Sequence, residues 1–410
     1  MRARTPWSPR YLLWRMAYRF GAYLHPWDLG WLEDRGGMST LRELGFADVA
    51  FPASYHAGTW TTPVGGKGLM RRLEDGVVYF RSGDGYGELQ PRPCPSMPGD
   101  GNSALQECIE RSNDAGLESH AWTVLFHNSR LGRLHSDSCA RNAVGDVYEY
   151  SLCPARPEVQ QYGLQLVTDV AAHEGLTCVE VEAMGFMGYR HGGHHVKSSF
   201  VVDPYLDFLM SFCFCDHCKT GLGALNVDGD ELQDLVAGLL RRLILDGDAM
   251  SPQRLSWQDS FDRLAAGLGR QNFLAMIRHR TMVYVGFLTK LRAKLREGVR
   301  LSVHLNMDPL FSGSQIGQPF HSVASMVDEI IVTHYGEPPM RMVDKWAGQK
   351  NVGRHTRIAI WPKSPEYNED KDIVAAMNLV EERKLDGLRI YHLGLLPWRT
   401  VERVMKVLTK

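Results

Sequence analysis

The sequence carries almost no net charge and has no long apolar run, and each lack argues against a class of function. Its 410 residues include 46 Lys and Arg and 47 Asp and Glu, which gives a net charge of −1. A chain without a basic excess does not favour nucleic acid as a partner, so we expect a small or neutral ligand. Uninterrupted apolar runs of about 18 residues, which a membrane span needs, are absent, so we expect no membrane association.

Cysteine is also used sparingly, with 8 residues in the chain, and the N-terminal segment does not read as a secretory signal. Residues 1–24 are basic and partly apolar, but Arg15 and Arg19 interrupt the segment and no small-residue cleavage site follows. We therefore interpret the segment as mature chain. The expectation is a cytoplasmic protein with reduced thiols.

Eight short apolar runs alternate with helix-like stretches such as 272–297 and 371–384. The runs are rich in Val, Ile, Leu and aromatic residues and are bounded by turn residues, which is typical of parallel β/α units. Eight such units predict an α/β protein with a single (β/α)8 TIM barrel over residues 1–410. The runs span residues 20–29, 46–56, 120–129, 176–186, 299–309, 328–336, 356–365 and 385–394.

Two long insertions interrupt this pattern in the βα loops 2 and 4. Residues 57–104 are rich in Pro and Gly, and we expect a loop over the barrel mouth with a hairpin that turns at 83–85. Residues 187–271, between the fourth and fifth predicted strands, contain three of the cysteines. This insertion is too short for a core of the usual domain size, so we interpret both insertions as parts of one barrel domain.

Polar and aromatic residues follow almost every predicted strand. Because the active site of such a barrel is built where its strands end, we expect these residues to converge on one pocket, although any one histidine could equally be a core residue. His25 is among these strand-end residues. Imidazoles would suit sugar hydroxyls, and aromatic rings, among them those of Trp60 and Tyr391, would stack on sugar rings. The expected substrate-binding residues are Tyr55, His56, His127, Asn128, His304, His334, Tyr335, Trp361 and His392, with His194, His195 and Lys197 of the glycine-rich segment 188–197.

Three thiols stand within six positions, at Cys213, Cys215 and Cys218. This spacing lets one loop wrap a metal ion, and tetrahedral Zn²⁺ prefers four soft ligands. We expect Cys153, after the third predicted strand, to supply the fourth ligand, with His217 in reserve. A closed four-thiolate site leaves no position open, so this zinc would be structural. The alternative, unliganded buried thiols or a redox group, would leave the cluster open to oxidation.

Glu180 and Glu182 stand two residues apart on the fourth predicted strand, so both side chains face the barrel interior. Glu182 would reach the mouth, where aromatic surroundings favour a protonated carboxyl group and suit a general acid. Glu180 would lie a layer deeper, and pairing with an arginine suits it better. Glycoside cleavage also needs a second carboxylate, for which Asp308 and Glu337 rank nearly equal, ahead of Glu366.

The segment 150–219 resembles the central region of family-42 β-galactosidases. The resemblance is carried by "CPARPEVQQY", then a strand that ends in glutamate, then "CFCDHC". In that family these thiols hold a zinc and the glutamate between them is the acid/base, which implies the same roles for the cysteine set and for Glu182. The chain departs from the family at Val181, where the family has Asn, and in lacking a glutamate at the end of the seventh strand. The whole chain also resembles uncharacterised bacterial glycosidase-like barrels.

Together these patterns predict a glycoside hydrolase for a neutral or weakly charged carbohydrate, with Glu182 as acid/base and Asp308 or Glu337 as its partner. A homo-oligomer is compatible with the sequence. A catalytically silent sugar-binding barrel is a second interpretation. A third is a metal-dependent hydrolase or isomerase that uses His127, Glu182, His304 and His334.

Overall fold

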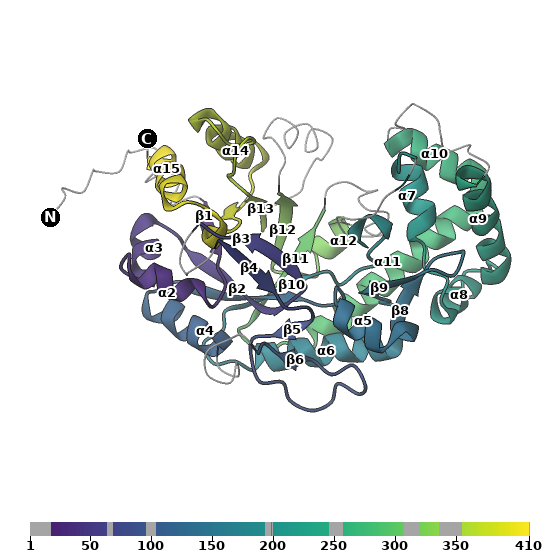
Figure 1. Cartoon of the computed structure of the whole chain (residues 1–410), viewed down its shortest axis with the longest axis horizontal. Helices are drawn as coiled ribbons and strands as arrows, with labels where there is room; N and C mark the ends of the chain where they lie inside the picture. Colours follow the sequence, from purple (N-terminus) through teal and green to yellow (C-terminus); the bar gives the residue numbers. More distant parts are fainter. Residues whose placement is uncertain are drawn as a thin grey trace.

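The structure is a computed structural model that describes residues 18–63, 69–95, 104–192, 198, 200–245, 257–306, 320–335 and 355–409. Within these residues, eight parallel strands form a closed barrel, in which the last strand pairs with the first (Figure 1). Every strand overlaps a predicted apolar run, so the (β/α)8 barrel is confirmed. The strands are β1 (Arg19–Tyr23), β2 (Asp48–Tyr55), β7 (Glu118–Val124), β10 (Cys178–Glu182), β11 (Arg300–Leu305), β12 (Glu329–His334), β13 (Thr356–Ile360) and β14 (Gly387–Ile390).

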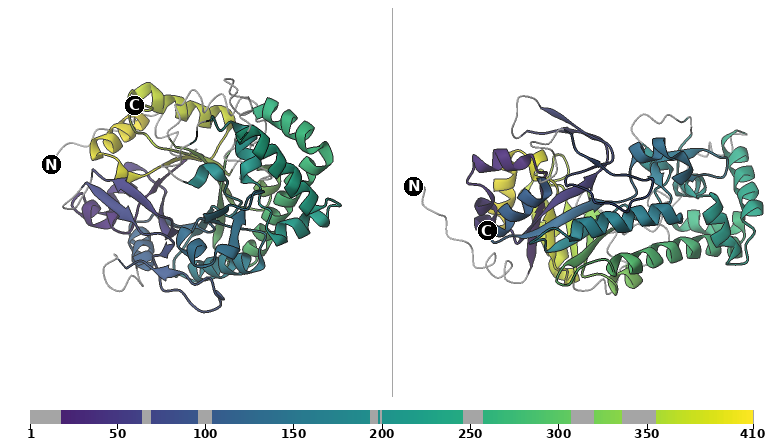
Figure 2. Two further views of the ribbon diagram at one scale, coloured as in Figure 1. Left: turned by 45° about the vertical axis from the view of Figure 1, so that its right-hand side comes forward. Right: turned by 90° about the horizontal axis from the view of Figure 1, so that it is seen from below.

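Helices cover the outside of the barrel (Figure 2). In α6, for example, Val159, Tyr162 and Leu166 recur at helical spacing and are buried against the strands, which explains why this segment is an amphipathic helix. The main helices that follow the barrel strands are α2 (Asp28–Glu33), α3 (Met38–Leu44), α4 (Ala104–Asp114), α5 (Ser129–Leu134), α6 (Pro157–Ala171), α11 (Arg270–Arg292), α12 (Phe320–Ala324), α14 (Asp370–Arg383) and α15 (Trp398–Thr409).

The deep interior of the barrel is a buried network of ion pairs. Asp48 on β2 accepts hydrogen bonds from Arg357 (2.7 Å) and Arg389 (2.5 Å), and Arg357 also pairs with Glu329 (2.7 Å). Gly21 leaves the space that this network needs, because a Cβ there would lie 2.2 Å from Asp48 Oδ1. The network joins strands that are far apart in the sequence and fills the layer beneath the barrel mouth.

The first insertion folds differently from the expectation. Its antiparallel hairpin is formed by β3 (Gly58–Thr61) and β4 (Met70–Leu73), whereas β5 (Val77–Val78) joins the barrel sheet and pairs in parallel with β6 (Arg92–Pro93). The expected hairpin with its turn at 83–85 is wrong. The reason is a distant contact, since Gly83 N–H and the Tyr86 hydroxyl both donate to Asp169 Oδ2 on α6, at 2.7 Å each.

The second insertion contains a helical lobe at one end of the molecule (Figure 1). Its helices are α7 (Pro204–Ser211), α8 (Asp216–Gly223), α9 (Gly229–Ile244) and α10 (Trp257–Leu268), which pack with the start of α11 around a small apolar cluster of their own. A further hairpin, β8 (Cys139–Arg141) with β9 (Val147–Leu152), leads toward this lobe.

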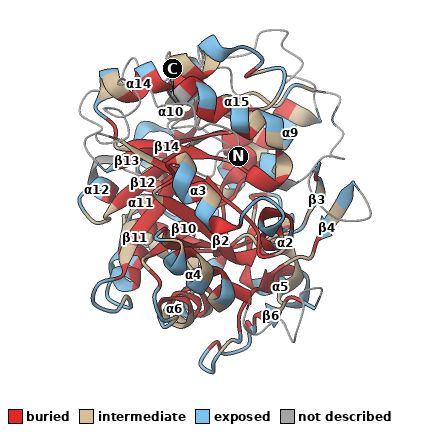
Figure 3. Cartoon of the chain, turned by 90° about the vertical axis from the view of Figure 1, so that its left-hand side faces the viewer, coloured by how far each residue is buried: buried red, intermediate tan, exposed pale blue. Residues whose placement is uncertain are grey.

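Burial follows this architecture, since the barrel strands are buried and the exposed residues lie mainly on the outer helices and loops (Figure 3). Among the described helices, none combines the length and the apolarity that crossing a membrane requires.

Candidate functional site

Glu182 ends β10 at the carboxyl edge of the barrel, where βα loops form the active sites of this fold. Its Oε2 atom accepts a hydrogen bond from Trp122 Nε1 at 2.5 Å, and His304 Nδ1 lies 3.7 Å from the same oxygen. The side chain is 30% exposed. A carboxylate that is oriented by one indole and still open to solvent can reach a ligand.

Glu180, two residues earlier on the same strand, is fully buried. It accepts hydrogen bonds from the Tyr23 hydroxyl (2.6 Å) and from His304 Nε2 (2.7 Å), and it pairs with Arg389. Burial raises its pKa, but the Arg389 charge and the hydrogen bonds outweigh burial, so the pKa lies well below its usual range. Glu180 is therefore an ionised structural group, and the expected pairing with an arginine is confirmed.

His304 on β11 lies between the two carboxylates. Its Nε2 atom binds Glu180, and its Nδ1 atom faces Glu182. Burial lowers the pKa of His304, but the nearby charges of Glu182 and Glu180 outweigh burial, so the pKa is raised. The imidazole can thus hold a positive charge next to Glu182.

An aromatic wall surrounds Tyr391, the residue that follows β14. Its ring stacks on Tyr335 with centroids 4.1 Å apart and meets Trp361 edge-on at 5.8 Å. Its hydroxyl lies 3.4 Å from that of Tyr55. Three of the expected substrate-binding residues therefore come together around Tyr391, whose ring was itself expected to stack on a sugar.

Two of the expected histidines also lie together. His56 and His127 stack with ring centroids 4.2 Å apart, and His191 meets His127 edge-on at 4.7 Å. Tyr55 stacks on His56 at 4.4 Å, which connects this histidine group to the aromatic wall. Burial and the neighbouring His56 and His191 lower the pKa of His127 well below its usual range, so this ring is neutral near pH 7.

His392 forms a buried pair with His25, the residue two positions after β1. His392 Nδ1 accepts the Gly394 N–H at 3.2 Å, so in the neutral ring Nε2 carries the proton and donates to His25 Nδ1 at 2.9 Å. His25 stacks on Trp27 at 4.1 Å and meets Trp60 of β3 edge-on at 4.3 Å. The sequence placed His25 among the strand-end residues and Trp60 among the rings expected to stack on sugars, but it did not predict that they contact each other.

Two of the expected residues that the structure describes, Asn128 and His334, do not join this group. Asn128 caps α5, because its Oδ1 accepts the Leu131 N–H at 2.9 Å. His334 has the same strand parity as Ile330 and Val332, which pack between the barrel and the helices, so alternation points it away from the interior. Other predictions lie outside the described residues, namely Asp308, Glu337, His194, His195 and Lys197.

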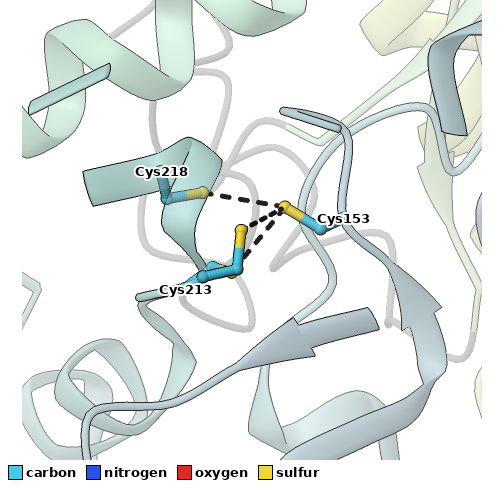
Figure 4. Close-up of side chains that lie close together, drawn as sticks. Cys153, Cys213 and Cys218 are labelled. Atoms are coloured by element: carbon cyan, nitrogen blue, oxygen red, sulfur yellow. Dashed lines mark hydrogen bonds between the residues drawn. The ribbon is translucent and has the colours of Figure 1, made fainter. Parts of the chain in front are cut away.

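The four predicted thiols form a compact cluster, in which Cys153 faces the loop that carries the other three (Figure 4). The Sγ atom of Cys153 lies 3.6 Å from those of Cys215 and Cys218 and 3.7 Å from that of Cys213. Four sulfurs around Zn²⁺ at bonds of about 2.3 Å would be separated by about 3.8 Å in a regular tetrahedron. The spacing therefore fits a tetrahedral zinc site.

Positive and donor groups surround the thiol cluster. The Arg141 N–H donates to Cys213 Sγ at 3.4 Å. Arg280 is buried beside the cluster, where its guanidinium lies 4.8 Å from the Phe212 ring centroid and donates to Ser211 O at 2.6 Å. Burial lowers the pKa of Arg280 to about 10, so it stays charged near pH 7. Four thiolates and Zn²⁺ carry a net charge of −2, which such groups would help to balance.

No protein-family model and no curated protein matches the sequence. Among solved structures, the catalytic domain of a β-amylase from Paenibacillus polymyxa matches with a TM-score of 0.56 and 11% identity, over 95% of this chain and 97% of that one. The PgaB (BpsB) glycoside hydrolase domain from Bordetella bronchiseptica matches with a TM-score of 0.53 and 12% identity, over 95% and 98%.

A β-galactosidase from the psychrophilic Marinomonas ef1 matches with a TM-score of 0.50 and 13% identity over 95% of this chain. The chain spans 59% of the length of that β-galactosidase. At these identities the likeness establishes the fold alone. The chain thus has the barrel fold that these glycosidases share.

Proposed function

We propose that the protein is a glycoside hydrolase in which Glu182 is the general acid/base. The observation that carries this proposal is the position of Glu182, a partly exposed carboxylate at the carboxyl end of a barrel strand, between an indole and an imidazole. The names of the three structural neighbours, a β-galactosidase, a β-amylase domain and a glycoside hydrolase domain, support the same class of reaction.

Each group near Glu182 has a role in the proposed reaction. The Trp122 indole fixes the Oε2 atom of Glu182, so that the other oxygen, Oε1, can give a proton to the leaving-group oxygen. His304 would stabilise the carboxylate that this transfer leaves behind. The partly exposed rings of the aromatic wall, Tyr335, Trp361 and Tyr391, offer flat surfaces on which sugar rings can stack.

Asp308 and Glu337 are the proposed partner carboxylates, and both lie outside the described residues. A separation of about 5 Å from Glu182 would favour a nucleophile and a retaining reaction, whereas about 6.5–9.5 Å would favour a water-activating base and inversion.

A metal-dependent reaction is less well supported. In the described part of the chain, the groups whose ligand atoms lie close enough for one ion are the thiol cluster, a set around His25 and a set around Glu180. None of these groups contains His127, Glu182 or His304. Strand parity also turns His334 away from the interior.

We also propose that the thiol cluster binds one structural Zn²⁺. The sulfur separations of 3.6–3.7 Å support this proposal. The ion would join Cys153, directly after β9, to the α7–α8 segment of the helical lobe, through Cys213, Cys215 and Cys218. With four thiolates in place it would have no open position, so it would hold the lobe on the barrel and take no part in hydrolysis.

The leaving group provides a test of the acid role. After a substrate has been found among aryl and alkyl glycosides, the Glu182→Gln protein should lose about 10²- to 10⁴-fold in turnover of the alkyl glycoside, which needs a proton. The loss should be much smaller for the nitrophenyl glycoside, whose leaving group departs unprotonated. Equal losses on both substrates would contradict the acid role of Glu182. Binding without turnover in the unaltered protein would favour a silent sugar-binding barrel.

A further inference from the structure

A hollow lies between the loops that follow β13 and β14, at the carboxyl edge of the barrel. Its volume is about 460 Å³, within the range of about 300–1,000 Å³ that is typical of small-molecule sites. The polar part of its lining consists of Trp361, Lys363, Ser364, Tyr367, Asn368, Arg399, Thr400 and Arg403. We call this hollow the loop 7/8 pocket, because its two loops follow the seventh and eighth strands of the barrel, β13 and β14.

The loop 7/8 pocket is next to the candidate active site. Both loops begin where barrel strands end, which places the pocket on the same face as Glu182. Trp361 belongs to both places, because it lines the pocket and its ring meets Tyr391 in the aromatic wall at 5.8 Å. A ligand in the mouth could therefore extend into the pocket.

The lining of the pocket is positively charged and contains no carboxylate among the described residues. Lys363 Nζ lies 4.1 Å from the centroid of the Trp361 ring. Arg403 donates to the backbone oxygens of Tyr367 and Asn368, which fix its guanidinium. Across the described ranges no ion pair with a carboxylate is found for Lys363, Arg399 or Arg403. Their charge is therefore available to a ligand.

Helix α15 adds to this positive field. It begins at Trp398, so Arg399 and Thr400 of the pocket lining lie in its first turn, which contains no acidic residue. The Thr400 N–H is already bound to Pro397 O at 2.7 Å. The helix therefore contributes the positive end of its dipole, and the Ser364 and Thr400 hydroxyls contribute donors.

We propose that the loop 7/8 pocket binds an oxyanion, a carboxylate or a phosphate, carried by the sugar that occupies the mouth. The preferred substrate is then an acidic glycoside, whereas the sequence alone led us to expect a neutral or weakly charged one. This inference rests on the proposed glycosidase function, because the anionic ligand is a substrate only if the protein cleaves glycosides. The binding of the anion itself can be tested without turnover.

The test compares the binding of three probes by titration calorimetry: D-glucuronate, inorganic phosphate and the neutral sugar D-glucose. The Lys363→Gln/Arg399→Gln variant removes two charges from the pocket. Arg403 is kept, because its hydrogen bonds to the backbone oxygens of Tyr367 and Asn368 support the local fold. The matched control is Lys290→Gln/Lys294→Gln, which removes two charges from a separate hollow between α6 and α11.

The unaltered protein should bind D-glucuronate or phosphate more tightly than D-glucose. Affinity for the anion should fall at least about tenfold in the pocket variant, because charge-assisted hydrogen bonds are lost, and should stay unchanged in the control. Binding of phosphate alone would identify a sugar phosphate, and binding of D-glucuronate alone would identify a uronic acid. An unaltered protein that binds neither anion, or that prefers D-glucose, would overturn the proposal, as would equal anion affinity in the two variants.

These outcomes are separate from the fate of the glycosidase proposal. Anion binding that depends on Lys363 and Arg399, in a protein whose turnover does not depend on Glu182, would retain the pocket and reject the acid role. Turnover that depends on Glu182, with no anion binding in the pocket, would retain the acid role of Glu182 and reject the pocket.

Discussion

Replacing Glu180 by glutamine should destabilise the fold far more than the same replacement at Glu182. Glu180 is fully buried and accepts from Tyr23 and His304 while it pairs with Arg389. The glutamine amide would place a donor against the Arg389 guanidinium. Removing one partner of a buried ion pair costs about 3–5 kcal/mol. Glu182 is 30% exposed and keeps an acceptor oxygen for Trp122 as glutamine, so we expect about 1 kcal/mol or less.

These free energies convert to melting temperatures through the entropy of unfolding. For 410 residues it is about 0.9 kcal/mol/K, from about 2.1 cal/mol/K per residue. Glu180→Gln should therefore lower the melting temperature by about 3–6 °C, and Glu182→Gln by about 1 °C. Thermal unfolding followed by circular dichroism at pH 7 measures both variants. A larger shift for Glu182→Gln than for Glu180→Gln would refute the division between a structural and a reactive carboxylate.

Two further predictions concern zinc and pH. Cys215→Ser should lower both the zinc content, measured by elemental analysis, and the melting temperature. The control Cys94→Ser, outside the cluster, should keep one zinc per chain. Unaltered protein that contains no zinc when purified without chelator would disprove the site. Burial raises the pKa of Asp48 and of Glu180, but it is outweighed in both cases: Arg357 and Arg389 lower the pKa of Asp48, and Arg389 lowers that of Glu180. The stability that they contribute is present above about pH 4 and is lost as the pH falls below it. The melting temperature should fall steeply as the pH is lowered from about 4 to about 2, and less steeply in Glu180→Gln. Equal slopes in the two proteins would count against the ion-pair network.

The barrel could be predicted from the sequence because its signal is local and repeated. Each strand is a short apolar run followed by a helix with apolar residues at helical spacing, and eight such units specify the fold. The hairpin at 83–85 failed because Gly83 and Tyr86 bind Asp169, more than 80 residues away, and no local pattern reports such a contact.

The candidate site was predictable where spacing within one strand or loop decides the geometry. Glu180 and Glu182 lie two positions apart on β10, and the thiols of 213–218 lie in one short segment. Asn128 shows the limit of this approach. It lies directly before a helix, where its side chain caps the first turn, so a polar residue after a strand need not face the pocket.

His25 shows a second limit, because its environment is built by contacts between distant segments. It follows β1, pairs with His392 after β14 and packs on Trp60 of β3. The position of His25 after a strand was readable, but its partners were not. Pairing between the first and last strands of a closed barrel brings such residues together, and periodicity alone does not identify which of them meet.

Turnover of an alkyl glycoside substrate by the Glu182→Gln protein tests the central claim most directly. If Glu182 is the general acid/base, the variant should remain folded, with a melting temperature within about 1 °C of the unaltered protein. Its turnover number should fall by about 10²- to 10⁴-fold. Full activity in a folded Glu182→Gln protein would contradict the claim.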